Sequence, residues 1–242
     1  MHVQQPLGRS WPRGSLLSNL SGPDRDALLG LGSFRRYTPG EALMVEGGRD
    51  TVVALLLDGC VKVLVAAEDG STVLLAIRAP GDVVGELAAL DGRPRSATVL
   101  AARGTSARVI SGVAFRGFLR ERPDAATELQ RSVAGKLRAA IRYRIDAVSG
   151  PVTVRLARTL DTLARAYGRP ARQGLRIDVP LSNADLAALA GLSTASVQRG
   201  LRALRASGAI ATEYRSVLVR DIAVLRAVAA GQDRPAAPGV AV

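Results

Sequence analysis

The sequence predicts an α+β fold in which an N-terminal β-barrel is followed by one long helix and a C-terminal domain of helices and a hairpin. Three observations support this fold. Short β-branched runs separated by turn signals fill the first half of the chain, as in small barrels and sandwiches. A stretch without turn signals runs from Pro123 to Gly150, and an order of helix, turn, helix and hairpin begins at residue 181. A length of 242 residues suits two domains.

The composition argues against most enzymes and metal proteins. Cys60 is the only cysteine and His2 the only histidine, which is too few for a disulfide, a histidine-based triad, haem ligation or an iron–sulfur cluster. No apolar run reaches the ~18–20 residues of a membrane helix, and the first residues lack the apolar core of a signal peptide. We therefore expect a cytoplasmic, non-enzymatic protein with no catalytic residues, no metal or prosthetic group and no membrane contact.

The charge of the chain predicts a polyanionic partner. The formal net charge is +12, and residues 151 to 242 hold 13 arginines against 6 acidic residues. Arginine suits bidentate pairing with phosphates and guanines. Codon bias would explain the arginines equally well, so composition alone leaves both explanations open.

The N-terminal part divides into an arm and a barrel. We expect a flexible arm over residues 1–15, with packing that begins near Leu16, Leu17 and Leu20, and a barrel domain over residues 16–122. Cys60 is predicted to be a buried strand residue. The expected strands include Phe34 to Tyr37, Ala42 to Val45, Val52 to Leu57, Val61 to Ala66 and Thr72 to Ile77.

Residues 123–149 are predicted to form one long amphipathic helix. Its apolar stripe consists of Leu129, Val133, Leu137, Ile141 and Ile145, which recur every four residues. The stripe has two possible partners, namely the barrel of its own chain or the same helix of a second copy. We favour the second copy, and so a homodimer, because a long helix between two domains needs another surface to cover its apolar edge. Ser149-Gly150-Pro151 marks a hinge after it.

Residues 150–230 are predicted to form a domain that contains a helix-turn-helix. A helix over Val152 to Tyr167 ends at Gly168-Arg169-Pro170, and residues 171 to 180 form a connection. Ser182 and Asp185 form a capping box that starts the next helix at Asn183. The motif needs a small residue, a left-handed turn and an apolar anchor, and the sequence supplies Ala187, Gly191 and Val197 at the required spacing. Residues 231–242 are expected to be a disordered tail.

The second helix of the motif is predicted to read DNA. It starts at Ser193 and runs to about Ala206, with Val197, Leu201 and Leu204 facing inward. Arginine, glutamine and small side chains on its outer face can contact base edges in the major groove. A hairpin wing, Ile210 to Thr212 with Ser216 to Val219, would bring Arg215 to a phosphate. The alternative is a helical hairpin with a solvated basic face, which we consider less favoured. The predicted DNA-binding residues are Ser193, Thr194, Ala195, Ser196, Gln198, Arg199, Arg202 and Arg215.

A second motif, in the barrel, is predicted to bind a phosphorylated sugar. Gly85 precedes a short helix whose first amides can face an anion, while Arg95 and Ser96 supply a charge and a hydroxyl. Glu86 would repel a phosphate but can accept a hydrogen bond from a sugar hydroxyl. An internal ion pair between Glu86 and Arg95 in a ligand-free barrel explains the residues equally well. The predicted ligand-binding set is Gly85, Glu86, Leu87, Arg95, Ser96 and Ala97.

With both motifs in this order, the sequence resembles the cyclic-AMP receptor protein/FNR (CRP/FNR) family of bacterial transcription regulators over residues 16 to 230. The resemblance implies a cyclic-nucleotide-binding barrel of the double-stranded β-helix or jelly-roll type and a homodimer paired along residues 124 to 148. It also implies allosteric control by cyclic AMP or another cyclic nucleotide. Glu86 would hold the ribose 2′-hydroxyl, Arg95 and Ser96 the cyclic phosphate, and Gly85 would offer its backbone. The expected partners are a near-palindromic double-stranded DNA site and RNA polymerase. The alternative function is a DNA-binding regulator whose barrel is a ligand-free dimerisation scaffold.

The sequence departs from the family pattern in two places. Ala140 and Ile141 stand where cyclic-AMP-binding members carry a Thr-Ser pair that receives the adenine, which leaves the base of the ligand open. Thr194 and Ala195 replace an Arg-Glu pair of the recognition helix. Because a glutamate there would accept a hydrogen bond from cytosine, we expect a different base pair in the DNA site at that position.

Overall fold

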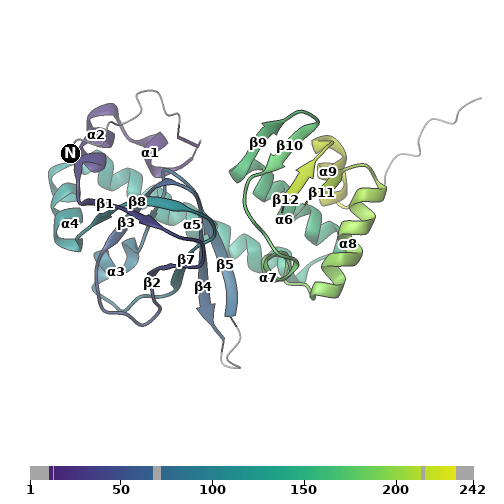
Figure 1. The fold of residues 1–242 in the computed structure, drawn as a ribbon, viewed down its shortest axis with the longest axis horizontal. Helices are drawn as coiled ribbons and strands as arrows, with labels where there is room; N and C mark the ends of the chain where they lie inside the picture. The colour runs from purple at the N-terminus through teal and green to yellow at the C-terminus, as the bar shows by residue number, and fades with distance from the viewer. Residues whose placement is uncertain (1–10, 13, 68–71, 214–215, 233–242) are drawn as a thin grey trace, which may run out of the picture. The chain divides into compact units, whose positions relative to one another are not determined.

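The computed structural model describes residues 11–12, 14–67, 72–213 and 216–232, with side chains omitted at 143–144 and 146–148. The chain divides into two compact units, residues 1–137 and 138–242 (Figure 1). Most of the predicted arm and tail, with His2 and Arg215, lie outside the described residues. Among the described residues, no helix combines the length and the apolar character that crossing a membrane requires.

The N-terminal unit contains two four-stranded antiparallel sheets, with orders β1-β8-β3-β6 and β2-β7-β4-β5. The described strands do not pair between the two sheets, so the predicted barrel is a two-sheet jelly roll and not a closed cylinder. The jelly-roll prediction itself is confirmed. The strands are β1 (Ser33–Tyr37), β2 (Ala42–Met44), β3 (Val53–Asp58), β4 (Val61–Ala66), β5 (Thr72–Arg78), β6 (Val83–Val84), β7 (Thr98–Ala101) and β8 (Thr105–Ile110).

Alternation along β3 builds two hydrophobic cores in this unit. Ala54 and Leu56 point between the sheets, whereas Val53 and Leu55 point to the other face, where helices cover the sheet. Phe115 is the largest fully buried side chain in the core beneath these helices. The helices are α1 (Leu16–Asn19), α2 (Gly22–Gly30), α3 (Glu86–Asp91), α4 (Gly112–Glu121) and the first part of α5 (Pro123–Val148). Packing begins at Leu16, Leu17 and Leu20, as predicted.

Cys60 is buried, as predicted, but it is not a strand residue. It lies between the end of β3 and the start of β4, where its carbonyl oxygen accepts a hydrogen bond from Thr105 Oγ1 at 3.1 Å. The preceding Gly59, at φ +83°, makes the tight turn that removes Cys60 from both strands.

The apolar stripe of α5 divides between two environments. Leu129 is only 2% exposed and Val133 is partly buried, because both pack into the core that contains Phe115. Leu137, Ile141 and Ile145 are 62%, 52% and 55% exposed. The alternative that the stripe packs on its own domain therefore holds for Leu129 and Val133, while the pairing of the last three residues with a second copy stays a prediction.

The C-terminal unit is a winged helix-turn-helix with a four-stranded sheet of order β11-β12-β10-β9. The predicted helices and wing are confirmed, but the predicted helix end and connection at residues 168–180 contain a hairpin of two strands. Pro170 is accommodated because β9 is an edge strand. The unit contains α6 (Val152–Tyr167), β9 (Gly168–Ala171), β10 (Gly174–Ile177), α7 (Asn183–Ala190), α8 (Thr194–Ala206), β11 (Ile210–Glu213), β12 (Ser216–Val219) and α9 (Ile222–Ala229).

Candidate functional site

The motif predicted in the jelly roll starts at a glycine that no other residue can replace without strain. Gly85 has φ +83° and joins β6 to α3. A Cβ atom there would lie 2.5 Å from Met44 Sδ and 2.6 Å from Arg95 Nη1. The carbonyl oxygen of Gly85 accepts a hydrogen bond from Arg95 Nη1 at 2.9 Å, so the structure brings these two predicted residues into contact.

Arg95 is a buried cation whose partner comes from a different loop. Only 4% of the residue is exposed, and its guanidinium donates to the carbonyl of Val52 at 2.6 Å and to the carboxylate of Asp50. The Arg95 hydrogen bond lowers the pKa of Asp50 from its ordinary value. Asp50 was not predicted as a site residue. Because its side chain is 55% exposed, it can leave Arg95 without crossing the core.

Glu86 pairs with Lys136 of α5, and not with Arg95. Glu86 is 6% exposed, and its Oε1 accepts a hydrogen bond from Lys136 Nζ at 2.8 Å. Lys136 also donates to the carbonyl oxygen of Val83 at 2.8 Å. The predicted alternative, an internal Glu86–Arg95 pair, is therefore wrong, since each residue has its own opposite charge. Sequence reasoning missed Lys136 because fifty residues separate it from Glu86.

A further acid lies close to the same lysine. Burial raises the pKa of Asp82 above its ordinary value, although Lys136 and Arg78 act against this rise. The remaining predicted ligand residues lie at the edge of the site: Leu87 and Ser96 are exposed, and Ala97 is partly buried. The arrangement combines a buried cation, Arg95, a buried acid, Glu86, and a glycine, Gly85, beside which another group can come close to the backbone. Such a set can receive a phosphate and a sugar hydroxyl.

The helix-turn-helix is held by local hydrogen bonds at both helix starts. Asp185 Oδ2 accepts from the backbone N–H of Ser182 at 2.7 Å, and Ser182 Oγ accepts from the N–H of Asp185 at 3.1 Å, which completes the predicted capping box. Gly191 ends α7 at φ +61°. Ala187 and Val197 are buried at the crossing of the two helices, as predicted.

The two faces of α8 differ sharply. Val197, Gly200, Leu201 and Leu204 are buried. Among the predicted DNA-binding residues of α8 and its cap, Ser196 is partly buried and accepts a hydrogen bond from Arg199 Nη2 at 2.8 Å. The others are exposed, namely Ser193, Thr194, Ala195, Gln198, Arg199 and Arg202. The structure thus brings this set onto one outer surface.

Two residues of α6 position this surface, and sequence reasoning identified neither. Arg155 Nη2 donates to the carbonyl oxygen of Ala190 at 2.9 Å and also to that of Gly191, so it satisfies the free end of α7. Leu156 packs so closely on α8 that a Cβ atom at Gly200 would lie 2.8 Å from its Cδ2. Together, Arg155 and Leu156 fix the turn between α7 and α8 and the position of α8 on α6.

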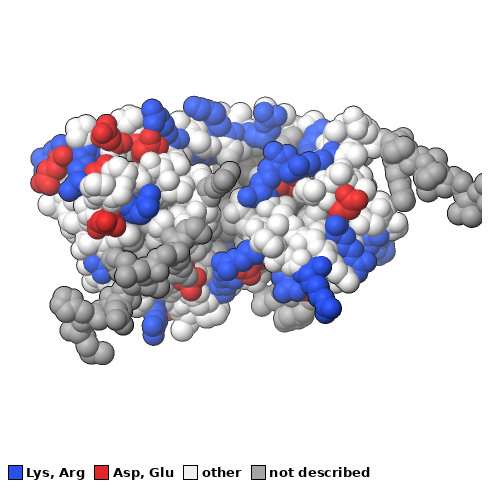
Figure 2. All heavy atoms as spheres, turned by 90° about the horizontal axis from the view of Figure 1, so that it is seen from above, with Lys and Arg blue, Asp and Glu red and all other residues white. Residues whose placement is uncertain are grey.

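Positive charge gathers on the C-terminal unit. Figure 2 shows one face on which basic side chains, in blue, are grouped over this unit with few acidic ones among them. Exposed arginines of the unit include Arg165, Arg169, Arg172, Arg176, Arg199, Arg202, Arg205 and Arg220. A surface of this kind attracts the phosphate backbone of nucleic acid.

Comparison with known proteins identifies the same two parts. Residues 34–122 match the family model of the cyclic nucleotide-binding domain, and residues 154–228 match that of the Crp-like helix-turn-helix domain. A CRP-like cAMP-activated global transcriptional regulator of Mycobacterium tuberculosis is 30% identical over 185 residues, which cover 76% of this chain and 83% of the relative.

Two proteins of Thermus thermophilus extend this similarity. The cyclic AMP receptor protein of that organism is 28% identical over 216 residues, with 89% of this chain and 97% of the relative covered. The crystal structure of a transcriptional regulator of the CRP family has a TM-score of 0.68 at 26% identity, with coverage of 82% of this chain and 97% of the other.

Asp161 provides a test of the ion pairs within α6 and between α6 and α9 in the C-terminal unit. Its side chain, 10% exposed, accepts hydrogen bonds from Arg165 Nε on the same helix and from Arg226 Nε on α9, both at 3.0 Å. Burial alone would raise the pKa of Asp161, but the hydrogen bonds from Arg165 and Arg226 outweigh it and leave that pKa below its ordinary value.

We predict that Asp161→Asn lowers the free energy of unfolding at pH 7 by about 1–3 kcal/mol. The loss should stay moderate because both arginines are exposed, so solvent weakens their ion pairs with Asp161. A lowered folded-state pKa stabilises the protein above the unfolded-state pKa, near 3.8, and this contribution disappears as the pH falls through the folded-state pKa. Urea unfolding at several pH values measures this. Glu213→Gln, which breaks an exposed pair with Arg176, is the control. Equal losses in both variants, or a loss that persists in acid, would contradict the prediction.

Proposed function

This chain belongs to the CRP/FNR family of transcription regulators, and from that premise we propose that it acts as a homodimer on a near-palindromic DNA site under the control of a phosphorylated ligand in the jelly roll. The single observation that carries the proposal is the capped helix α8, which is buried on one side and presents a row of unburied polar and basic side chains on the other. The relative from Mycobacterium tuberculosis, described as cAMP-activated, supports a cyclic nucleotide as the ligand.

DNA recognition follows from the side chains along α8. Arg199 and Arg202 can each bridge O6 and N7 of a guanine, and Gln198 can pair with an adenine. Thr194 and Ala195 are short, so they let the helix approach the bases closely. In a two-fold dimer the two copies of α8 must lie ~34–36 Å apart to enter successive major grooves. Any ligand that changes this separation changes the affinity for DNA.

Ligand binding would proceed by exchange of one anion for another on Arg95. A buried guanidinium needs an opposite charge, and Asp50 supplies it in this structure. The phosphate of a cyclic nucleotide carries one negative charge and would take the place of Asp50, while Glu86 and Lys136 would meet the ribose hydroxyl. A ligand-free scaffold, the competing function, would keep the Asp50–Arg95 pair permanently.

The dimer is supported by the free part of α5. Leu137, Ile141 and Ile145 are spaced by one helical turn each and are all more than half exposed, which is unusual for three large aliphatic side chains in a row. The same three residues on a second α5 would cover them in a contact between two helices.

For DNA binding, we predict that Arg199→Ala lowers the affinity for a palindromic duplex selected from a random library by about 1–3 kcal/mol, or roughly 5- to 150-fold. Random duplex should be affected much less, because only base contacts discriminate between sequences. Fluorescence anisotropy at several salt concentrations measures both affinities. Arg220→Ala removes an exposed arginine of the same unit outside α8 and should affect both duplexes alike. Equal losses on both duplexes with Arg199→Ala, or an affinity independent of salt, would refute the assignment.

For ligand control, we predict that calorimetry detects binding of cyclic AMP or another cyclic nucleotide, and that Arg95→Ala abolishes it. Arg93→Ala, which removes an exposed arginine two residues away, should leave binding intact. Asp50→Asn should bind the nucleotide more tightly, because a neutral amide competes less well for the guanidinium. Silence with every cyclic nucleotide would favour the scaffold function, and equal losses in Arg95→Ala and Arg93→Ala would remove Arg95 from the site.

For the dimer, we predict that Ile141→Asp converts the protein from dimer to monomer at micromolar concentrations, because it places a charge in the apolar seam. Sedimentation equilibrium measures the change. Val113→Asp alters an aliphatic residue of α4 that is 70% exposed and should leave the dimer intact. A wild-type monomer would refute the dimer, and an Ile141→Asp dimer as tight as the wild type would place the interface elsewhere.

A further inference from the structure

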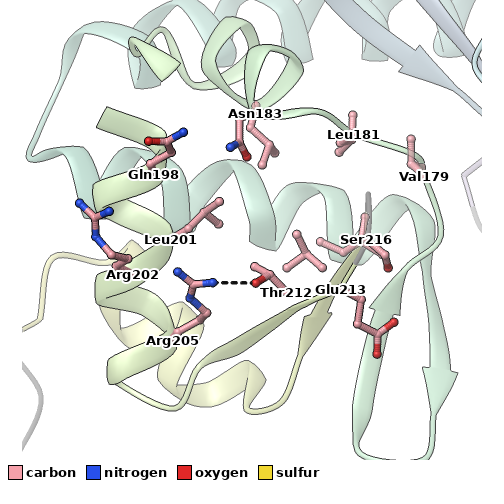
Figure 3. Close-up of a pocket in the computed structure, with 13 residues that line it drawn as sticks. Val179, Leu181, Asn183, Gln198, Leu201, Arg202, Arg205, Thr212, Glu213 and Ser216 are labelled. Atoms are coloured by element: carbon pink, nitrogen blue, oxygen red, sulfur yellow. Dashed lines mark hydrogen bonds between the residues drawn. The ribbon is translucent and has the colours of Figure 1, made fainter. Parts of the chain in front are cut away.

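A cavity of about 250 Å³ lies within the C-terminal unit, between α8 and the wing. Figure 3 shows α8 on one side of it and the wing strands on the other, while the segment from Val179 to Asn183 closes a third side. The cavity belongs to the DNA-binding unit alone and shares no residue with the motif around Gly85 and Arg95. None of the proposed functions above uses it as a site.

The cavity has an apolar floor and a polar rim. Ile177, Leu186, Leu201 and Val217, all buried core residues, contribute to its lining. The polar lining residues include the side chains of Asn183, Gln198 and Thr212. Typical ligand sites are mainly apolar with a few polar groups, whereas this cavity is mainly polar and has a smaller apolar patch that can hold a short apolar body.

One polar atom of the lining has no hydrogen-bond partner among the described residues. Ser216 Oγ is inaccessible to solvent and makes no hydrogen bond to the described residues. Buried hydroxyls in folded proteins nearly always have a hydrogen-bond partner, because water would otherwise solvate them better. Because water does not reach this atom, a ligand in the cavity could become its partner only if the Ser216 side chain rotated toward the cavity.

The charges around the cavity favour an anion. Arg205 reaches from α8 to the wing, where its Nη1 donates to the neutral Thr212 Oγ1 at 2.9 Å (Figure 3). No carboxylate of the described residues forms an ion pair with Arg205 or with Arg202. The acidic lining residue Glu213 already pairs with Arg176, at 3.2 Å. Among the described residues, Arg202 and Arg205 of the cavity therefore have no acid bonded to them.

We propose that this cavity binds a small organic anion, with one carboxylate or phosphate on an apolar body. Its apolar part would lie on Leu186 and Leu201, and its charge would meet Arg205. A polar atom of the ligand would meet the Ser216 hydroxyl after rotation of that side chain. A cavity of about 250 Å³ is below the ~300–1,000 Å³ of typical ligand sites, so the molecule is smaller than a nucleotide. A phosphate of the DNA backbone lacks the apolar body that the floor requires.

Such a site would also affect DNA binding, a consequence that rests on the proposed function of α8. Gln198 and Arg202 line the cavity and belong to the set that we propose to face the major groove. An anion held beside them would repel the phosphates of DNA and engage side chains that base contacts need. The ligand and DNA would then weaken each other's binding by the same factor.

The test compares three probes of similar shape on the full chain: benzoate, phenyl phosphate and the neutral benzyl alcohol. We expect saturation-transfer NMR titrations to show saturable binding of benzoate or phenyl phosphate, at least tenfold tighter than that of benzyl alcohol. Arg205→Met should remove this preference. Arg220→Met, a matched loss of one exposed arginine in the same unit, should keep it. Ser216→Val should weaken binding of both anions, and circular dichroism melting checks that all three variants fold.

Equal affinity for the charged and neutral probes would overturn the proposal, as would equal behaviour of Arg205→Met and Arg220→Met. A second experiment measures the affinity for duplex DNA by fluorescence anisotropy, once in benzoate and once in chloride at the same ionic strength. Benzoate should lower the duplex affinity of the wild type several-fold and leave that of Arg205→Met unchanged. An equal fall in both proteins would mean that benzoate acts only by general screening of charge. Failure to bind any duplex would instead overturn the proposed function, while the probe titrations would still stand.

Discussion

A buried charge must keep an opposite charge beside it, and this requirement organises the jelly roll around its ligand motif. Arg95 lies almost fully inside the domain, where an unpaired guanidinium would cost several kcal/mol. Asp50 supplies this charge from the surface. The carbonyl oxygen of Gly85 adds a neutral acceptor, and Arg95 can approach it this closely because Gly85 has no side chain. The same rule accounts for Glu86, which has Lys136 as its cation. Each buried charge of the motif therefore already has a partner of opposite charge. An anionic ligand can bind Arg95 only by replacing Asp50.

The second ion pair connects the motif to the long helix. Lys136 is the point at which α5 contacts Glu86 and the end of β6, and it immediately precedes Leu137, the first exposed residue of the apolar stripe. The stripe changes character here because the core containing Phe115 covers Leu129 and Val133 but extends no further along the helix. A change in the partner of Glu86 would therefore act on α5 directly before Leu137, Ile141 and Ile145, the exposed residues of the stripe. Under the ligand control that we propose, this ion pair would be the first step.

Local signals explain what the sequence could predict, and distance along the chain explains what it could not. The helix-turn-helix was predictable because Ser182, Asp185, Gly191 and Ser193 act on neighbouring residues. Asp50 and Lys136 were not, because they meet Arg95 and Glu86 across 45 and 50 residues. The hairpin of β9 and β10 was missed because Gly168 and Pro170 indicate a break, while the pairing of β10 with the distant β12 stabilises strands there. Helix α4 did carry an unused signal, since Ser111 caps it and Phe115 and Phe118 recur at helical spacing.

The two faces of α8 are under different physical constraints, and this bears on how such a protein acquires its own DNA site. On the inner face, Val197 is fully buried and Gly200 admits no side chain beside Leu156, so nearly any substitution there would disturb the packing of the unit. On the outer face, Thr194 and Ala195 are exposed and bear none of that packing. Arg155 holds the preceding turn through backbone carbonyls, which are present whatever the side chains are. The position of α8 thus does not depend on Thr194 and Ala195, which we propose to contact the bases. Under that proposal, Thr194 and Ala195 in place of the family's Arg-Glu pair would alter which base pair is preferred without altering how the helix is presented.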